Sequence, residues 1–208
     1  MFPSFFSGLN GVHLNLGLTP AERGIIIGQA SASGKGVGRN FSASLVVGIA
    51  KRCARGCPKV LLCNPLNGVH PFPTTFWLSC PHLLRIIGRV EGRNGVASME
   101  DCLRGREAEW ARYNAAYALL RLSLIPAARR RFLSERRRRI FSSLRQRGVG
   151  GVSISEGHVF VKCIHLQSAS FLGMGGHPAA EWLMMNITKW DCDDGECLPR
   201  RKELSPKG

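Results

Sequence analysis

The chain has 208 residues, of which 44% are hydrophobic and 21% are charged, and this balance excludes wholesale disorder. Its formal net charge of +15 favours an anionic partner such as nucleic acid, another polyanion or an acidic membrane surface, unless the charge only forms a solvated basic surface. No stretch approaches the roughly 20 apolar residues that a membrane-spanning helix requires.

The first twenty residues lack the basic start and the continuous apolar centre of a secretory signal, so we expect a cytoplasmic protein. In that compartment the eight cysteines would be reduced. We expect an irregular arm over residues 1–22, a single domain over 23–198 and a mobile basic tail over 199–208.

A short helix can begin at Thr19-Pro20, because threonine caps helices and proline suits the first turn. The glycine- and serine-rich stretch 28–40 predicts a loop. It superficially resembles a phosphate-binding loop, but its glycines are one residue too far apart and Gly36 stands where a magnesium-binding hydroxyl should be. We therefore predict no nucleotide site there.

Three β-prone segments, near residues 45–47, 59–63 and 74–78, predict a small antiparallel sheet. The second and third should pair across a loop of about ten residues. Ser79-Cys80-Pro81 then predicts the start of a helix that runs to about Glu91.

The second half of the chain reads as predominantly helical. A buried stripe of Trp110, Tyr113, Tyr117, Leu120 and Leu124 predicts a helix from about residue 107 to 124. Further segments predict a helix over 127–147, a strand-like stretch at 158–161, a helix from about 165 to 172 and a last helix over 177–190. The predicted class is α+β, with the small sheet packed against this helical half.

An unusual phrase runs from Pro71 to Pro81, reading Pro-Phe-Pro-Thr-Thr-Phe-Trp-Leu-Ser-Cys-Pro. It is accompanied by Arg52-Cys53, Gly56-Cys57-Pro58-Lys59-Val60, Arg89, Glu91, Gly95, Gly148-Val-Gly-Gly-Val152, Val161-Lys-Cys-Ile-His165 and His177-Pro178. Over roughly residues 37–198 these motifs make the chain resemble the uncharacterised bacterial family called domain of unknown function 501. The resemblance implies a cytoplasmic protein often encoded near a septum-formation protein and an exopolyphosphatase-like enzyme, and it implies no known activity. After His165 the chain carries Gln167 and Ser170 where the family tends to have further histidines.

Cysteine and histidine residues supply the candidate chemistry. Cys80 lies at a predicted helix start, where backbone N–H groups and the helix dipole can lower the pKa of a thiol. Cys163 and His165 would face the same side of a strand. A soft centre that would suit zinc or an iron–sulfur cluster could be built from some of Cys57, Cys80, Cys163, His165, Cys192 and Cys197.

The same residues allow two other interpretations. Cys80 could be a nucleophilic thiolate with His165 as its base. Alternatively, several of the cysteines are simply buried, as free cysteine often is, and the chain contains no Cys-x-x-Cys pair that would favour a metal.

The segment 127–147 carries nine arginines against one acid, a net charge of +8. Guanidinium groups suit phosphate, so this helix could contact a nucleic-acid backbone or an anionic membrane surface. The candidate contacts are Arg129, Arg130, Arg131, Arg136, Arg137, Arg138 and Arg139. Because they would wrap around a helix rather than form one stripe, the pattern also fits diffuse attraction or a solvated surface. Our leading hypothesis is a Cys/His centre that binds a metal or supplies a reactive thiol, and the alternative is a nucleic-acid-associated basic protein.

Overall fold

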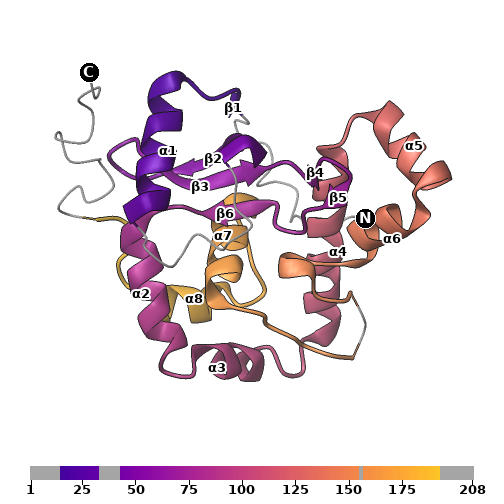
Figure 1. The fold of residues 1–208 in the computed structure, drawn as a ribbon. Helices are drawn as coiled ribbons and strands as arrows, with labels where there is room; N and C mark the ends of the chain where they lie inside the picture. The colour runs from indigo at the N-terminus through magenta and orange to yellow at the C-terminus, as the bar shows by residue number, and fades with distance from the viewer. Residues whose placement is uncertain (1–14, 33–42, 155–156, 193–208) are drawn as a thin grey trace, which may run out of the picture.

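An antiparallel sheet of four strands, in the order β1-β2-β3-β6, forms the upper part of the molecule (Figure 1). The computed structural model describes residues 15–32, 43–154 and 157–192. The strands are β1 (Asn15–Leu16), β2 (Val46–Arg52), β3 (Pro58–Cys63) and β6 (Phe76–Leu78). All six residues of β3, including Lys59, are buried, because the strand is covered on both faces. The predicted α+β class and small antiparallel sheet are confirmed.

The predicted pairing of the segments 59–63 and 74–78 is confirmed by β3 and β6, whose register places Val60 opposite Leu78. The loop between them holds a second, two-stranded sheet made of β4 (Leu66–Asn67) and β5 (His70–Pro71). The strand predicted near 45–47 begins with a short 3-10 helix, η2 (Ala43–Leu45), and becomes extended only from Val46.

Helix α1 (Pro20–Ala32) covers one face of the sheet, where Ile26 packs against Val46, Ile49 and Leu61. Its predicted start is confirmed by a capping box: the Glu22 N–H donates to Thr19 Oγ1 at 3.2 Å, and the Thr19 N–H donates to Glu22 Oε2 at 2.8 Å.

Near the N-terminus, the structure differs from two of the predicted element boundaries. The predicted loop from residue 28 is wrong in its first part, because α1 continues through Ala32. Strand β1 and the first turn of α1 lie within residues 15–22, which the sequence assigned to an arm. The division into arm, domain and tail stays a prediction, and residues 1–14 and 199–208 lie outside the described residues.

Helices from the rest of the chain lie on the other side of the sheet, and the helix over residues 164–174 packs directly against β2, β3 and β6 (Figure 1). They are α2 (Pro81–Glu91), α3 (Gly95–Cys102), α4 (Glu107–Ser123), α7 (Ile164–Met174) and α8 (Ala180–Asn186). The predicted stripe on α4 is buried as far as Leu120 and partly buried at Leu124, and it anchors the sheet as well: the Tyr117 hydroxyl oxygen accepts the Thr75 N–H at 2.7 Å. Burial of this aromatic stripe is what joins the helical half to the sheet.

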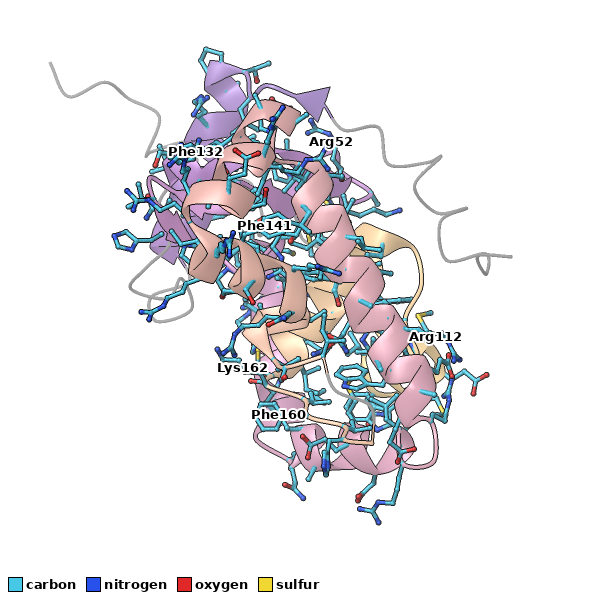
Figure 2. All side chains as sticks on the ribbon, turned by 90° about the vertical axis from the view of Figure 1, so that its right-hand side faces the viewer. Arg52, Arg112, Phe132, Phe141, Phe160 and Lys162 are labelled. Carbon is cyan, nitrogen blue, oxygen red and sulfur yellow. The ribbon has the colours of Figure 1, made fainter. Side chains whose placement is uncertain are left out.

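The arginine-rich segment is not one helix but two, α5 (Ala127–Arg136) and α6 (Arg138–Gln146), followed by η3 (Val149–Gly151). Arg137 breaks the helix with φ −135° and ψ 50°. The break lets Leu133 of α5 and Leu144 of α6 enter one apolar cluster with Leu122. Phe141 is partly buried against that cluster, whereas Phe132 of α5 is 51% exposed. Figure 2 shows both side chains on this face of the molecule.

The strand-like stretch predicted at 158–161 is wrong, because Val161 donates its N–H to Glu100 Oε1 at 2.8 Å and not to a neighbouring strand. The helix predicted over 165–172 is confirmed as α7, and the one predicted over 177–190 is shorter, as α8. Within the described ranges no helix is both long and apolar enough to cross a membrane.

Glycine is required where α7 crosses β6. A Cβ atom on Gly173 would lie 2.4 Å from Cδ1 of Phe76, a ring that is itself 1% exposed. We predict that Gly173→Ala lowers the free energy of unfolding by about 2 kcal/mol through overpacking. The matched control is Gly88→Ala in α2, an exposed position with no atom within 4 Å of the added Cβ, which should raise stability by about 0.5–1 kcal/mol. Equal effects of the two variants in urea unfolding would contradict this account of the crossing.

Candidate metal centre

The C-terminal end of α2 meets the N-terminal end of α7, and the two helices pack against each other. Leu83 and Ile87 of α2 and Ile164 of α7 are fully buried in the main core, which fixes the approach of the helix ends. Three half-buried side chains that can bind a metal or exchange a proton meet there. Glu91 is the last residue of α2, Cys163 caps α7, and His165 lies in the first turn of α7.

Glu91 accepts hydrogen bonds from the start of α7. Its Oε1 atom lies 2.5 Å from the Ile164 nitrogen, 3.3 Å from the His165 nitrogen and 3.0 Å from His165 Nδ1. Burial alone would raise the Glu91 pKa, but the imidazole and the two backbone N–H groups hold it below its ordinary value. A carboxylate at a helix N-terminus is favoured because the first N–H groups of a helix have no partner within it.

His165 is oriented through its second nitrogen. Nε2 lies 3.1 Å from the Leu84 carbonyl oxygen, and because a carbonyl can only accept, this nitrogen carries a hydrogen and Nδ1 is the atom that faces Glu91. Burial acts to lower the pKa of His165, but hydrogen bonds with Cys163, Glu91 and the Leu84 carbonyl outweigh it and raise the pKa to about 10.

Cys163 has extended backbone dihedrals and caps α7 with its sulfur, which accepts the Leu166 N–H at 3.4 Å. It also hydrogen-bonds with His165. The prediction that Cys163 and His165 lie together is therefore right, although they are brought together by a helix start and not by alternation along a strand.

One ligand atom from each of Glu91, Cys163 and His165 lies within 4.8 Å of the other two. Sulfur, imidazole nitrogen and carboxylate oxygen are the three donor types that proteins use for zinc. In the part of the chain that the structure describes, no other set of three such residues is this close. The sequence offered no local signal for Glu91 as a ligand, because its partner at Ile164 is 73 residues away.

Cys80 occupies the N-cap position of α2 as predicted, with Pro81 in the first turn, but it is 1% exposed. Burial raises the pKa of its thiol, and hydrogen bonds from the backbone N–H groups of Leu83 and His82 offset only part of that effect. The expectation that the helix start lowers the Cys80 pKa is thus wrong, because loss of solvation outweighs it. The hydrogen bonds of the His165 ring go to Glu91, Leu84 and Cys163, so the predicted pairing of Cys80 with His165 finds no support in them.

The remaining predicted thiols gather elsewhere. Cys57 and Cys192 pack with Cys53 in a separate buried cluster at the turn between β2 and β3. Asp191 holds the chain there, since its Oδ1 lies 2.6 Å from the buried Lys59 ammonium and accepts the Ala54 N–H at 3.1 Å. Cys197, the last predicted ligand, lies outside the described residues.

The arginines of the basic segment divide between α5 and α6. Arg129 donates to the Gly68 carbonyl at 2.8 Å, and Arg131 pairs with Glu135 at 2.9 Å. Arg130, Arg136, Arg137, Arg138 and Arg139 are exposed or nearly so. The prediction of one continuous helix is therefore wrong, and the arginines are distributed over two short helices.

Comparison with known families matches residues 49–185 to the family described as "Protein of unknown function (DUF501)". No curated protein and no solved structure matches the chain.

The negative charge of Glu91 is one cause of the raised His165 pKa, so its removal should lower that pKa. We predict that in the metal-free protein Glu91→Gln lowers the His165 pKa from about 10 toward its ordinary value of 6.5. NMR titration of the imidazole ring measures this change. Because the His165 pKa is raised in the folded protein, the stability that the His165–Glu91 pair contributes is complete below about pH 6.5 and is lost as the pH rises through about 10. Between these pH values the free energy of unfolding should therefore fall less in Glu91→Gln than in the wild type. The control Glu181→Gln on α8, which removes an exposed acid, should leave the His165 titration unchanged.

Proposed function

The chain belongs to the protein family of unknown function DUF501, and from that premise we propose that it is a metal-binding protein whose ion is held by Cys163, His165 and Glu91. Zinc is the ion that this site suits best. A cytoplasmic location, which the sequence predicts, would keep the Cys163 thiol reduced and available as a ligand.

The observation that carries the proposal is the convergence of three different donor atoms within 4.8 Å. The His165 ring supports it independently, because its Nε2–H points to the Leu84 carbonyl at 3.1 Å. Metal-binding histidines commonly donate their second N–H to a carbonyl or carboxylate, which fixes the ring and leaves the other nitrogen for the ion. Oε1 of Glu91 is engaged by α7, and no hydrogen bond to its Oε2 is found among the described residues, so that oxygen can serve as the ligand.

The donor set favours zinc over an iron–sulfur cluster. Such clusters are held mainly by several thiolates, whereas this group contains a single sulfur. Three protein ligands that leave a fourth position for water or substrate are typical of catalytic zinc sites, whereas structural zinc sites use four protein ligands. The proposal therefore includes an ion with an open coordination position.

Metal binding at this centre must displace protons. In the metal-free protein the raised pKa keeps His165 protonated at neutral pH, and only the neutral imidazole can coordinate an ion. The ion would take the place of that proton beside the Glu91 carboxylate, so affinity should increase with pH.

A second candidate function rests on Cys163 itself. Its sulfur accepts a hydrogen bond at the start of α7 and lies beside a cationic imidazole, an arrangement found around reactive cysteines. In this alternative Cys163 is a reactive thiol and His165 the group that exchanges its proton, the roles that the sequence assigned to Cys80 and His165.

Zinc affinity tests the proposal. Competition with a chromophoric chelator should show one zinc bound by the metal-free protein, and Cys163→Ser should weaken binding by at least about a hundredfold, since loss of even an outer-shell partner costs 10–100-fold. Replacing zinc with cobalt should give a thiolate-to-metal charge-transfer band that is lost in the same variant.

Cys102→Ser is the matched control, because Cys102 is an exposed cysteine of α3 outside the group, and it should bind zinc as the wild type does. Unchanged zinc affinity in Cys163→Ser would remove Cys163 from the site and with it the proposal.

Alkylation separates the two candidate functions. We predict that zinc protects Cys163, but not Cys102, from iodoacetamide, because a metal-bound sulfur is no longer free to react; peptide mass spectrometry measures both sites in one sample. A Cys163 that reacts several times faster than Cys102 and at the same rate with and without zinc would instead support the reactive thiol.

A further inference from the structure

A pocket of about 470 Å³ lies along α6, apart from the metal centre. Guanidinium and hydroxyl groups line it, and none of the described residues in its wall is acidic. The principal lining residues are Arg138, Arg139, Ser142, Ser143, Arg147 and Ser153.

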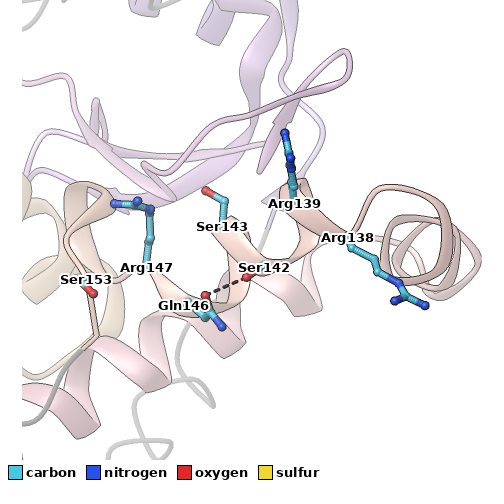
Figure 3. Close-up of a pocket in the computed structure, with 7 residues that line it drawn as sticks. All are labelled: Arg138, Arg139, Ser142, Ser143, Gln146, Arg147 and Ser153. Carbon is cyan, nitrogen blue, oxygen red and sulfur yellow. Dashed lines mark hydrogen bonds between the residues drawn. The ribbon is translucent and has the colours of Figure 1, made fainter.

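The helical period brings part of this set onto one face. Arg139 and Ser143 are four residues apart in α6, and Arg147 follows after four more, directly beyond the helix end. Figure 3 shows these three side chains projecting to the same side of the α6 ribbon, while Arg138 points away from them. Ser153 is held next to Arg147 by an antiparallel bridge between the two residues.

Among the described residues, no acid neutralises the cations of the pocket. Arg131 on α5 pairs with Glu135, but Arg138, Arg139 and Arg147 form no ion pair with any acid in the described ranges. Arg147 is instead fixed by a hydrogen bond from its Nη1 to the Gly151 carbonyl at 3.0 Å. The Ser142 hydroxyl donates to Gln146 Oε1 at 2.8 Å, and Ser143 is the hydroxyl that lies between the two arginines of the shared face.

We propose that this pocket binds the phosphate groups of an anionic ligand, with Arg139 and Arg147 as its principal cationic contacts and Ser143 as a hydroxyl donor. Guanidinium groups bind phosphate oxygens through charge-assisted, often bidentate hydrogen bonds. Arg147 follows Arg139 by eight positions, one residue beyond the end of α6, and at the helical rise this separates their backbones by about 12 Å, so the two side chains suit a ligand with more than one phosphoryl group. A polyphosphate, a nucleoside triphosphate and a single-stranded RNA share this chemistry.

Isothermal titration at about 0.15 M salt, where exposed charges more than about 8 Å apart are largely screened, tests the proposal with two probes, inorganic triphosphate and a short single-stranded RNA of mixed sequence. Arg139→Gln should weaken binding of the true ligand class about tenfold, the cost of one charge-assisted contact. The Arg139 side chain is exposed and makes no hydrogen bond or ion pair with the described residues, so an unchanged melting temperature is expected for this variant. Arg147→Gln should weaken binding similarly and provides the second variant.

Arg136→Gln is the charge-matched control, since Arg136 is an exposed arginine of α5 outside the pocket, and it should change affinity less than twofold. Selective weakening with triphosphate supports a small phosphorylated ligand, and selective weakening with RNA alone supports a nucleic-acid backbone in the same pocket. Equal weakening by all three substitutions would show diffuse attraction and overturn the proposal, as would failure of both probes to bind.

Discussion

The Glu91 carboxylate joins two helices whose residues lie 73 positions apart in the chain, and the candidate centre depends on it. One oxygen accepts two backbone N–H groups at the start of α7 and faces the His165 ring. A helix end that packs against another helix needs partners for its first N–H groups, and Glu91 supplies them. The same interaction therefore caps a helix and orients a candidate ligand, so the geometry of the site follows from the packing of α2 on α7.

A comparable role belongs to the polar residues of α4, which connect the sheet with the basic part of the molecule. Tyr117 accepts the Thr75 N–H from the sheet, and Asn114 Oδ1 accepts the Val149 N–H of η3 at 2.9 Å. Arg121, which is 0% exposed, donates to the carbonyl groups of Arg147 and Gly148. Buried polar groups of this kind are retained because each finds a backbone partner. They fix the chain immediately after α6, and so they also position the Arg147 side of the phosphate pocket.

Local patterns predicted most of the elements, because the β-prone run at 59–63 and the aromatic stripe of α4 can be recognised from neighbouring residues alone. Boundaries were less predictable where a distant contact decides them. The arginine-rich segment has a helical apolar pattern throughout, and only the shared cluster around Leu122 explains the break at Arg137. Likewise Val161 lies in a β-prone stretch, yet its N–H is taken by Glu100 of α3. Such partners are determined by tertiary packing, which cannot be deduced from the periodicity of the sequence.

The candidate site shows the same division between local and distant information. Cys80 and Cys163 both occupy the N-cap position of a helix, and a helix start is visible in the sequence around Cys80. What separates them is environment: Cys80 is sealed in the main core, whereas Cys163 is half-buried beside a cationic ring. The motif Cys-x-His supplies sulfur and nitrogen, but the third donor comes from the end of another helix. A thiol at a helix start therefore becomes a candidate for chemistry only where packing leaves it partly exposed and brings a charged partner to it.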